Sequence, residues 1–201
     1  MRKRLSRLPL VCALVACAAL VLAACGGGES DDEKIEATIV TAVKGNDPAS
    51  CTELLSQRVV EQLTKAEGRE AIAKCEESAA EDTAVRSLRV ADVRVADETA
   101  TAEVSFAGGT FDGQTVTMDL VEEDGQWKVD ELTGFAGFDS ARLLSTLKEI
   151  VFTPGSQSAG EEAQAECILE ELQAEPDAEL EGLLLDPGSE VLENVFSVCV
   201  G

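Results

Sequence analysis

Apolar residues recur with a helical period in the part of the chain that follows residue 30. Ile35, Ile39 and Val43 repeat every four residues, which predicts an amphipathic helix. The glycine- and proline-containing run over residues 45–48 is expected to end that helix. Three shorter segments of helical character follow, starting near Pro48, Arg58 and Glu70.

The apolar period changes from 3.6 to 2 at Val85, which predicts β-strands from there on. Apolar residues alternate over residues 88–90 and again over residues 93–95, but in the opposite phase. We therefore expect a β-bulge at Ala91 and Asp92, a feature that bends a sheet.

Two further strands alternate cleanly, with Phe106 and Met118 among their inward positions. The pair Asp124-Gly125 is a strong hairpin signal before the strand that carries Trp127. These strands predict an antiparallel meander with one buried face and one solvent-facing side. Short N-terminal helices packed on a bent antiparallel sheet make an α+β domain, which we place at residues 34–138. An immunoglobulin-like sandwich is the main rival, and the four consecutive helical segments count against it.

A helical pattern returns after residue 138. We assign residues 139–160 to a helix and a linker, because the last part is rich in glycine, proline and small polar residues. Residues 161–201 are helical as well, but a segment of this length is too short to build a generous core alone. We expect a small helical module there, closed by a disulfide.

Residues 1–24 have the features of a secretory signal peptide, a basic head followed by an uncharged apolar run. The run is shorter than the roughly 20 apolar residues of a comfortable membrane span. Its end, Leu22-Ala23-Ala24-Cys25, resembles the lipobox of bacterial lipoproteins. That resemblance implies lipidation of Cys25, cleavage just before it, and a flexible tether over residues 25–33. The alternative is an ordinary cleaved signal with a chance cysteine.

Charge and cysteine content fit an exported chain. Without the four basic residues of the leader, 12 of the 16 Lys and Arg remain against 39 Asp and Glu, a net charge of −27. Such a charge argues against nucleic acid as a partner. Four cysteines remain after the leader and Cys25, an even number that suggests two disulfides. Three pairings are open, and the local spacing favours Cys51–Cys75 and Cys167–Cys199.

One family matches this order of elements. A helix, a Gly-Asn-Asp-Pro break, cysteine-bearing helices and strands that end in Asp-Gly-Gln-Trp-Lys-Val-Asp together resemble the nuclear transport factor 2-like (SnoaL-like, cystatin-like) fold over residues 32–132. The chain is most similar to the exported actinobacterial lipoproteins of that superfamily. The resemblance implies a cone-shaped domain whose cavity could hold a ligand.

Candidate chemistry is sparse. The chain has no His and no Tyr, which excludes Ser-His-Asp and Cys-His arrangements and the tyrosine oxyanion hole of ketosteroid isomerase-like members. We predict no catalytic residue, no metal site and no cofactor. Phe111, in its glycine-flanked loop, is expected to be exposed. For a ligand pocket, the candidates are Asp92, Phe106, Met118 and Trp127.

These observations predict a non-enzymatic lipoprotein, held by acylated Cys25 on the extracytoplasmic face of the cell membrane. It would act as an envelope assembly module with a protein partner, or as a module that binds a small ligand. The alternative is an enzyme that uses carboxylates in the cavity, with Asp92 as the candidate base.

Overall fold

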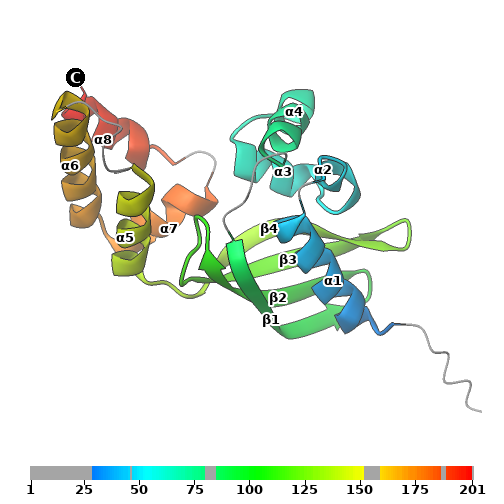
Figure 1. Cartoon of the computed structure of the whole chain (residues 1–201). Coiled ribbons are helices and arrows are strands. Elements are labelled where there is room, and N and C mark those ends of the chain that lie inside the picture. Colours follow the sequence, from blue (N-terminus) through cyan, green and yellow to red (C-terminus); the bar gives the residue numbers. More distant parts are fainter. Residues whose placement is uncertain (1–28, 46, 80–84, 152–158, 187–188, 201) are drawn as a thin grey trace, which may run out of the picture.

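The computed structural model describes residues 29–45, 47–79, 85–151, 159–186 and 189–200 (Figure 1). The predicted signal peptide and residues 25–28 of the predicted tether, Cys25 among them, lie outside these residues. Residues 31–33, assigned to the tether from the sequence, form the first turn of α1. In the described part, the helices are α1 (Asp31–Lys44), α2 (Ser50–Glu53), α3 (Gln57–Thr64), α4 (Gly68–Ala79), α5 (Ser140–Val151), α6 (Ala159–Ala174), α7 (Asp177–Leu185) and α8 (Val191–Cys199). The strands are β1 (Val85–Ala96), β2 (Thr99–Gly108), β3 (Thr115–Glu123) and β4 (Gln126–Gly137).

The four strands form one antiparallel sheet in the order β1-β2-β3-β4, and helices precede and follow it (Figure 1). This arrangement confirms the expected α+β class and the meander. The pairing of β1 with β2 shifts register between Ala91 and Arg94, and Asp92 has a φ of 49°. The β-bulge therefore lies where the apolar phase slips. Asp124 and Gly125 both have positive φ, as a tight hairpin between twisted strands requires.

The first core lies between α1 and one face of the sheet. Alternate residues of β2 and β3 are buried on this face. Ile35 and Ile39 of α1 pack against them and have no exposed surface. Ser30 begins α1 with a capping box, in which its hydroxyl accepts from the Glu33 N–H and the Glu33 carboxylate accepts from the Ser30 N–H. The buried face of α1, which carries Ile35 and Ile39, is the one that the sequence pattern predicted.

A second core lies among the C-terminal helices. Its buried members come from α5, α6, α7 and α8, and they are Leu143, Leu172, Leu180, Val191 and Val195. The helix α5 thus packs with the later helices, although its sequence gave no sign of which core it would join. Leu185, at the end of α7, packs instead against the first core.

A row of phenylalanines joins the two cores. The ring centroids of Phe106 and Phe111 are 5.4 Å apart, those of Phe111 and Phe135 are 6.3 Å apart, and those of Phe135 and Phe138 are 5.0 Å apart. The expectation of an exposed Phe111 was wrong. The Phe111 ring packs against the first core and is partly buried.

Asp112 ties this loop to its neighbours. Its carboxylate accepts from the Gly108 N–H and forms ion pairs with Arg86 and Arg142. Two contacts hold the pKa of the Asp112 carboxyl below its ordinary value. The hydrogen bond from the Gly108 N–H has the larger effect, and the Arg142 guanidinium has the next largest. A carboxyl with a lowered pKa contributes stability above its unfolded pKa of about 3.9 and loses it as the pH falls through the folded value.

We therefore expect Asp112→Asn to lower the melting temperature at neutral pH, and the difference from the wild type to shrink below about pH 4. Thermal melts of both proteins between neutral and acidic pH measure that difference. A gap that stayed constant down to strongly acidic pH would show that the ionised carboxylate is not the stabilising group.

Candidate functional site

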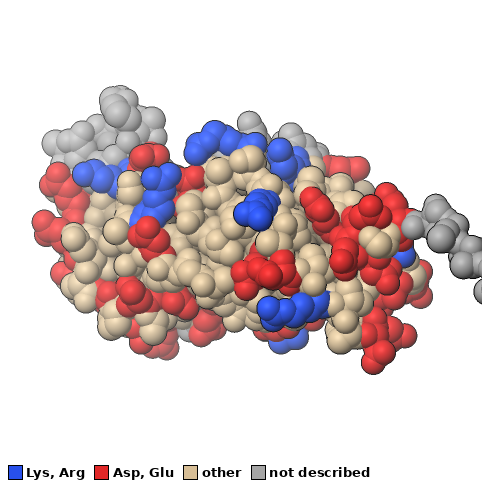
Figure 2. Space-filling view, turned by 90° about the horizontal axis from the view of Figure 1, so that it is seen from below, with Lys and Arg blue, Asp and Glu red and all other residues tan. Residues whose placement is uncertain are grey.

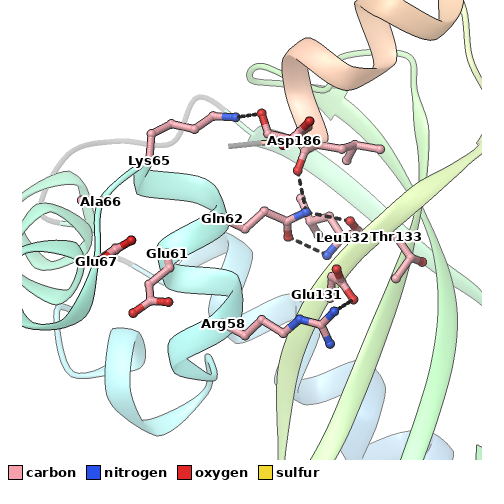
Figure 3. Close-up of a pocket in the computed structure, with 11 residues that line it drawn as sticks. Arg58, Glu61, Gln62, Lys65, Ala66, Glu67, Glu131, Leu132, Thr133 and Asp186 are labelled. Atoms are coloured by element: carbon pink, nitrogen blue, oxygen red, sulfur yellow. Dashed lines mark hydrogen bonds and ion pairs between the residues drawn. The ribbon is translucent and has the colours of Figure 1, made fainter. Parts of the chain in front are cut away.

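A groove of about 840 Å³ opens at the seam between the two cores (Figure 3). Its lining comes from α3, the turn into α4, the middle of β4 and the end of α7. The lining residues are Arg58, Glu61, Gln62, Lys65, Ala66, Glu67, Glu131, Leu132, Thr133, Leu185 and Asp186. These segments are far apart in the sequence, so the groove exists only in the folded chain.

Gln62 is the buried centre of the groove. Its Oε1 accepts from the Leu132 N–H at 2.9 Å, and its Nε2 donates to the Leu132 carbonyl at 2.8 Å (Figure 3). The same Nε2 donates to the Leu185 carbonyl at 2.8 Å. The amide thus pairs with the edge strand as a neighbouring peptide group would, and it also binds the end of α7. Removing it would leave these buried backbone groups unpaired, at a cost of about 1–3 kcal/mol for such a group.

Charged side chains form the rim. Arg58 forms ion pairs with Glu131 at 2.5 Å and with Asp130 at 3.4 Å. Lys65, in the left-handed conformation that ends α3, donates from its Nζ to the Asp186 carbonyl. Burial lowers the pKa of the Lys65 ammonium, and the nearby Asp186 opposes that effect. Both cations of the lining are therefore engaged by the protein itself.

Glu61, in the same rim, connects α3 to the start of α4 through hydrogen bonds. Its Oε1 accepts from the Gln57 amide at 2.7 Å and from the Gly68 N–H at 2.8 Å. These two hydrogen bonds, the one from Gln57 first, hold the pKa of the Glu61 carboxyl below its ordinary value. A carboxylate of lowered pKa is a weaker base at neutral pH than one of raised pKa. The hydrogen bonds fit Glu61 for closing the α3–α4 turn and for presenting negative charge.

The four residues predicted to form a pocket lie elsewhere. Phe106, Met118 and Trp127 belong to the first core, with exposed fractions of 7%, 3% and 2%. Asp92 is exposed on the bulge of β1. The structure therefore brings three of them together as packing residues and leaves Asp92 apart from them.

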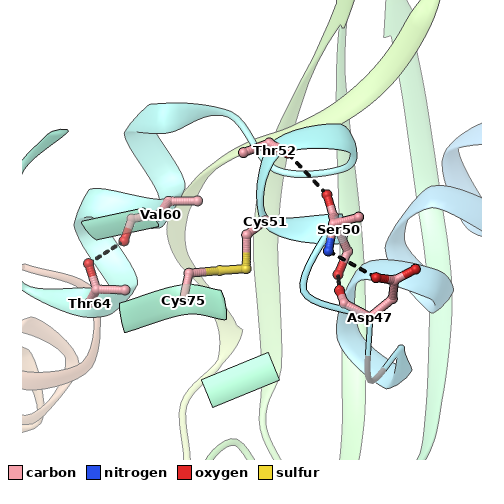
Figure 4. The surroundings of a disulfide bond; sticks show 8 residues. Asp47, Ser50, Cys51, Thr52, Val60, Thr64 and Cys75 are labelled. Carbon is pink, nitrogen blue, oxygen red and sulfur yellow. Dashed lines mark hydrogen bonds between the residues drawn. A yellow bond between two sulfur atoms is a disulfide. The ribbon is translucent and has the colours of Figure 1, made fainter. Parts of the chain in front are cut away.

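The two disulfides pair the cysteines that the spacing favoured, Cys51 with Cys75 and Cys167 with Cys199. The first links α2 to α4 beside α3, where Cys51 is buried (Figure 4). The second links α6 to α8. Disulfides persist in oxidising compartments, so this pattern indicates an extracytoplasmic domain.

Comparison with known proteins identifies no relative. Family models, curated proteins and solved structures each gave no match for this chain. Within the described residues, no helix is long and apolar enough to span a membrane. The same part of the chain has no group of three or more acidic or cysteine side chains arranged to hold a metal ion.

Only one sequence signal pointed to the groove. Gln62 lies next to the apolar positions Val59 and Val60 on α3 and is buried with them. Leu63, which the pattern placed on the same face, is 47% exposed. A polar residue on a buried helix face needs hydrogen-bond partners, and the amide of glutamine can both donate and accept. The partners themselves, on β4 and α7, depend on tertiary contacts that the sequence pattern does not contain.

Proposed function

We propose that this chain is a lipid-anchored, non-enzymatic binding module of the cell envelope, and that the groove between α3, β4 and α7 is its binding site. The observation that carries the proposal is the groove itself, a concave surface in which hydrogen bonds and ion pairs hold the polar groups in place. A prearranged polar site of this size suits binding, because little ordering remains to be done when a ligand enters. The lipobox and the resemblance to nuclear transport factor 2-like lipoproteins support the anchor and the family.

The charges of the groove define the class of ligand. Four carboxylates line it against two cations, and both cations already bind protein groups. Together with the net charge of −27, this favours a positively charged ligand or a basic segment of an envelope protein. The apolar surface of Leu132 and Leu185 would contact its carbon skeleton.

Two measurements test the proposal. The full chain, expressed with its own leader in a bacterial host, is expected in the membrane fraction, and Cys25→Ser is expected to abolish lipid attachment. Native mass spectrometry of the chain purified from the envelope is expected to show an additional mass that is lost on denaturation.

Glu67→Lys tests the groove specifically. This exposed residue lines the rim, and its reversal should weaken retention of the additional mass. Glu76→Lys, an equal charge change on the exposed surface of α4 outside the groove lining, is the matched control. Equal retention by both variants would contradict the site, and a wild-type chain without lipid would contradict the anchor.

A further inference from the structure

The C-terminal helices hold a second groove, of about 370 Å³, whose lining is entirely apolar. It is formed by Leu147 of α5, by residues of α6 and α7, and by Leu192 and Phe196 of α8. The remaining lining residues are Ala165, Ile168, Leu169, Leu172, Leu183 and Leu184. A polar group placed there would lose its water without gaining a hydrogen bond to a lining side chain, which is unfavourable. The occupant must therefore present hydrocarbon.

The rim of this groove is exposed on α8. Leu192 is 39% exposed and Phe196 is 46% exposed, and they lie one turn apart on the same face of the helix. The disulfide Cys167–Cys199 fixes α8 to α6, so the two walls that bear Phe196 and Leu169 are covalently linked. The groove is thus a pre-formed feature with an apolar edge open to solvent.

The surroundings of the groove are acidic. Residues 159–200 contain twelve Asp and Glu and no Lys or Arg. Leu169 also lines a neighbouring hollow to which Glu166 and Glu170 contribute, together with Lys148 of α5. Glu193 stands one turn from Phe196. Figure 2 shows many acidic side chains and a few basic ones over this end of the molecule, on the left of the view. Acidic residues outnumber basic ones around the groove, and an apolar groove in a predominantly negative field favours a positively charged partner.

We propose that this groove binds a basic amphipathic helix of a partner protein. Leucine-type side chains at helical spacing would enter the groove, and flanking Lys and Arg would face the acidic rim. A second copy of this chain would bring another acidic module against the first, and an anionic lipid would meet the same repulsion. The start of α1, which follows the predicted tether, lies at the opposite end of the molecule from α8 (Figure 1). The groove therefore lies at the end of the molecule remote from the predicted anchor.

The test uses residues 26–201 with both disulfides formed and a synthetic helical peptide of about 16 residues, with leucines at positions i, i+3, i+4 and i+7 and lysines on the other face. Calorimetric titration should show saturable binding. A peptide of the same composition with scrambled order, and one with glutamates in place of lysines, should each bind at least about tenfold more weakly. Equal binding of either control would overturn the proposal.

A matched pair of variants locates the site. Phe196→Ser should weaken binding of the lysine peptide about tenfold, because Phe196 lines the groove. Val198→Ser should leave binding unchanged, because Val198 is 63% exposed on the same helix but is not part of the lining. An equal effect of the two substitutions would overturn the assignment. Two further results would also overturn the assignment. If sedimentation showed a dimer that Phe196→Ser abolishes and Val198→Ser does not, the occupant would be a second copy of the chain. If the protein bound neutral phosphatidylcholine vesicles with the same dependence on Phe196, the occupant would be a lipid chain.

Discussion

Replacing Cys167 and Cys199 together by serine is expected to destabilise the C-terminal helices by about 3.5 kcal/mol, the chain-entropy value for a loop of this length. The two cysteines are 32 residues apart, and their bond joins α6 to α8. The twelve acids of this region repel one another, so the covalent link acts against a charge that favours separation of the helices. Without it, α8 would be held mainly by the packing of its buried residues, Val191 and Val195.

Two optical signals separate this effect from a general loss of stability. The single tryptophan, Trp127, lies in the first core, so its fluorescence reports unfolding of the sheet. Far-ultraviolet circular dichroism reports the helices of both cores. In denaturant titrations of the double variant, the dichroism transition should begin at a lower concentration while the fluorescence transition shifts much less.

The double variant Cys51→Ser, Cys75→Ser is the matched control, because it removes the disulfide that closes a loop of similar length in the helices that cover the first core. In that variant the fluorescence transition itself should shift to a lower denaturant concentration. If removing Cys167–Cys199 moved both signals together by the same amount, the phenylalanine row and the contacts of Gln62 would have to couple the two cores into one cooperative unit.

Features that depend on one element and its neighbouring residues could be predicted from the sequence. The helical period around Ile35 and the alternation of the strands depend on one element and one buried face, and the structure confirms both. The bulge near Asp92 and the turn at Asp124-Gly125 were predictable for the same reason, since a phase slip and a left-handed turn leave marks in the adjacent residues.

Contacts between remote elements were not predictable in this way. Gln62 and Gln114 each pair their side-chain amide with the backbone of a distant segment, Gln62 with Leu132 and Gln114 with Asp139. The residues next to each glutamine in the sequence do not predict these partners. The same holds for Leu185, which joins the first core although its helix belongs to the second. The polar groove was missed because it is made of such contacts, while the residues chosen from strand phase belong to the core.

Trp127 is the residue whose truncation should cost the first core most, and Trp127→Ala is expected to destabilise the protein by about 3–5 kcal/mol. The side chain is 2% exposed, under α1 and among the apolar residues of the sheet. Alanine would leave a cavity the size of an indole, which the close-packed surroundings can fill only in part. Chemical denaturation followed by circular dichroism measures the change, since the variant has lost its fluorescent reporter.

Trp127→Phe separates packing from hydrogen bonding. The indole Nε1 is buried and has no hydrogen-bond partner among the described residues. Phenylalanine keeps most of the apolar volume and leaves no donor unpaired, so we expect a loss below about 1.5 kcal/mol. If Trp127→Phe cost as much as Trp127→Ala, the indole N–H would have to bond in solution. A small cost would show that Trp127 holds α1 to the sheet through packing alone.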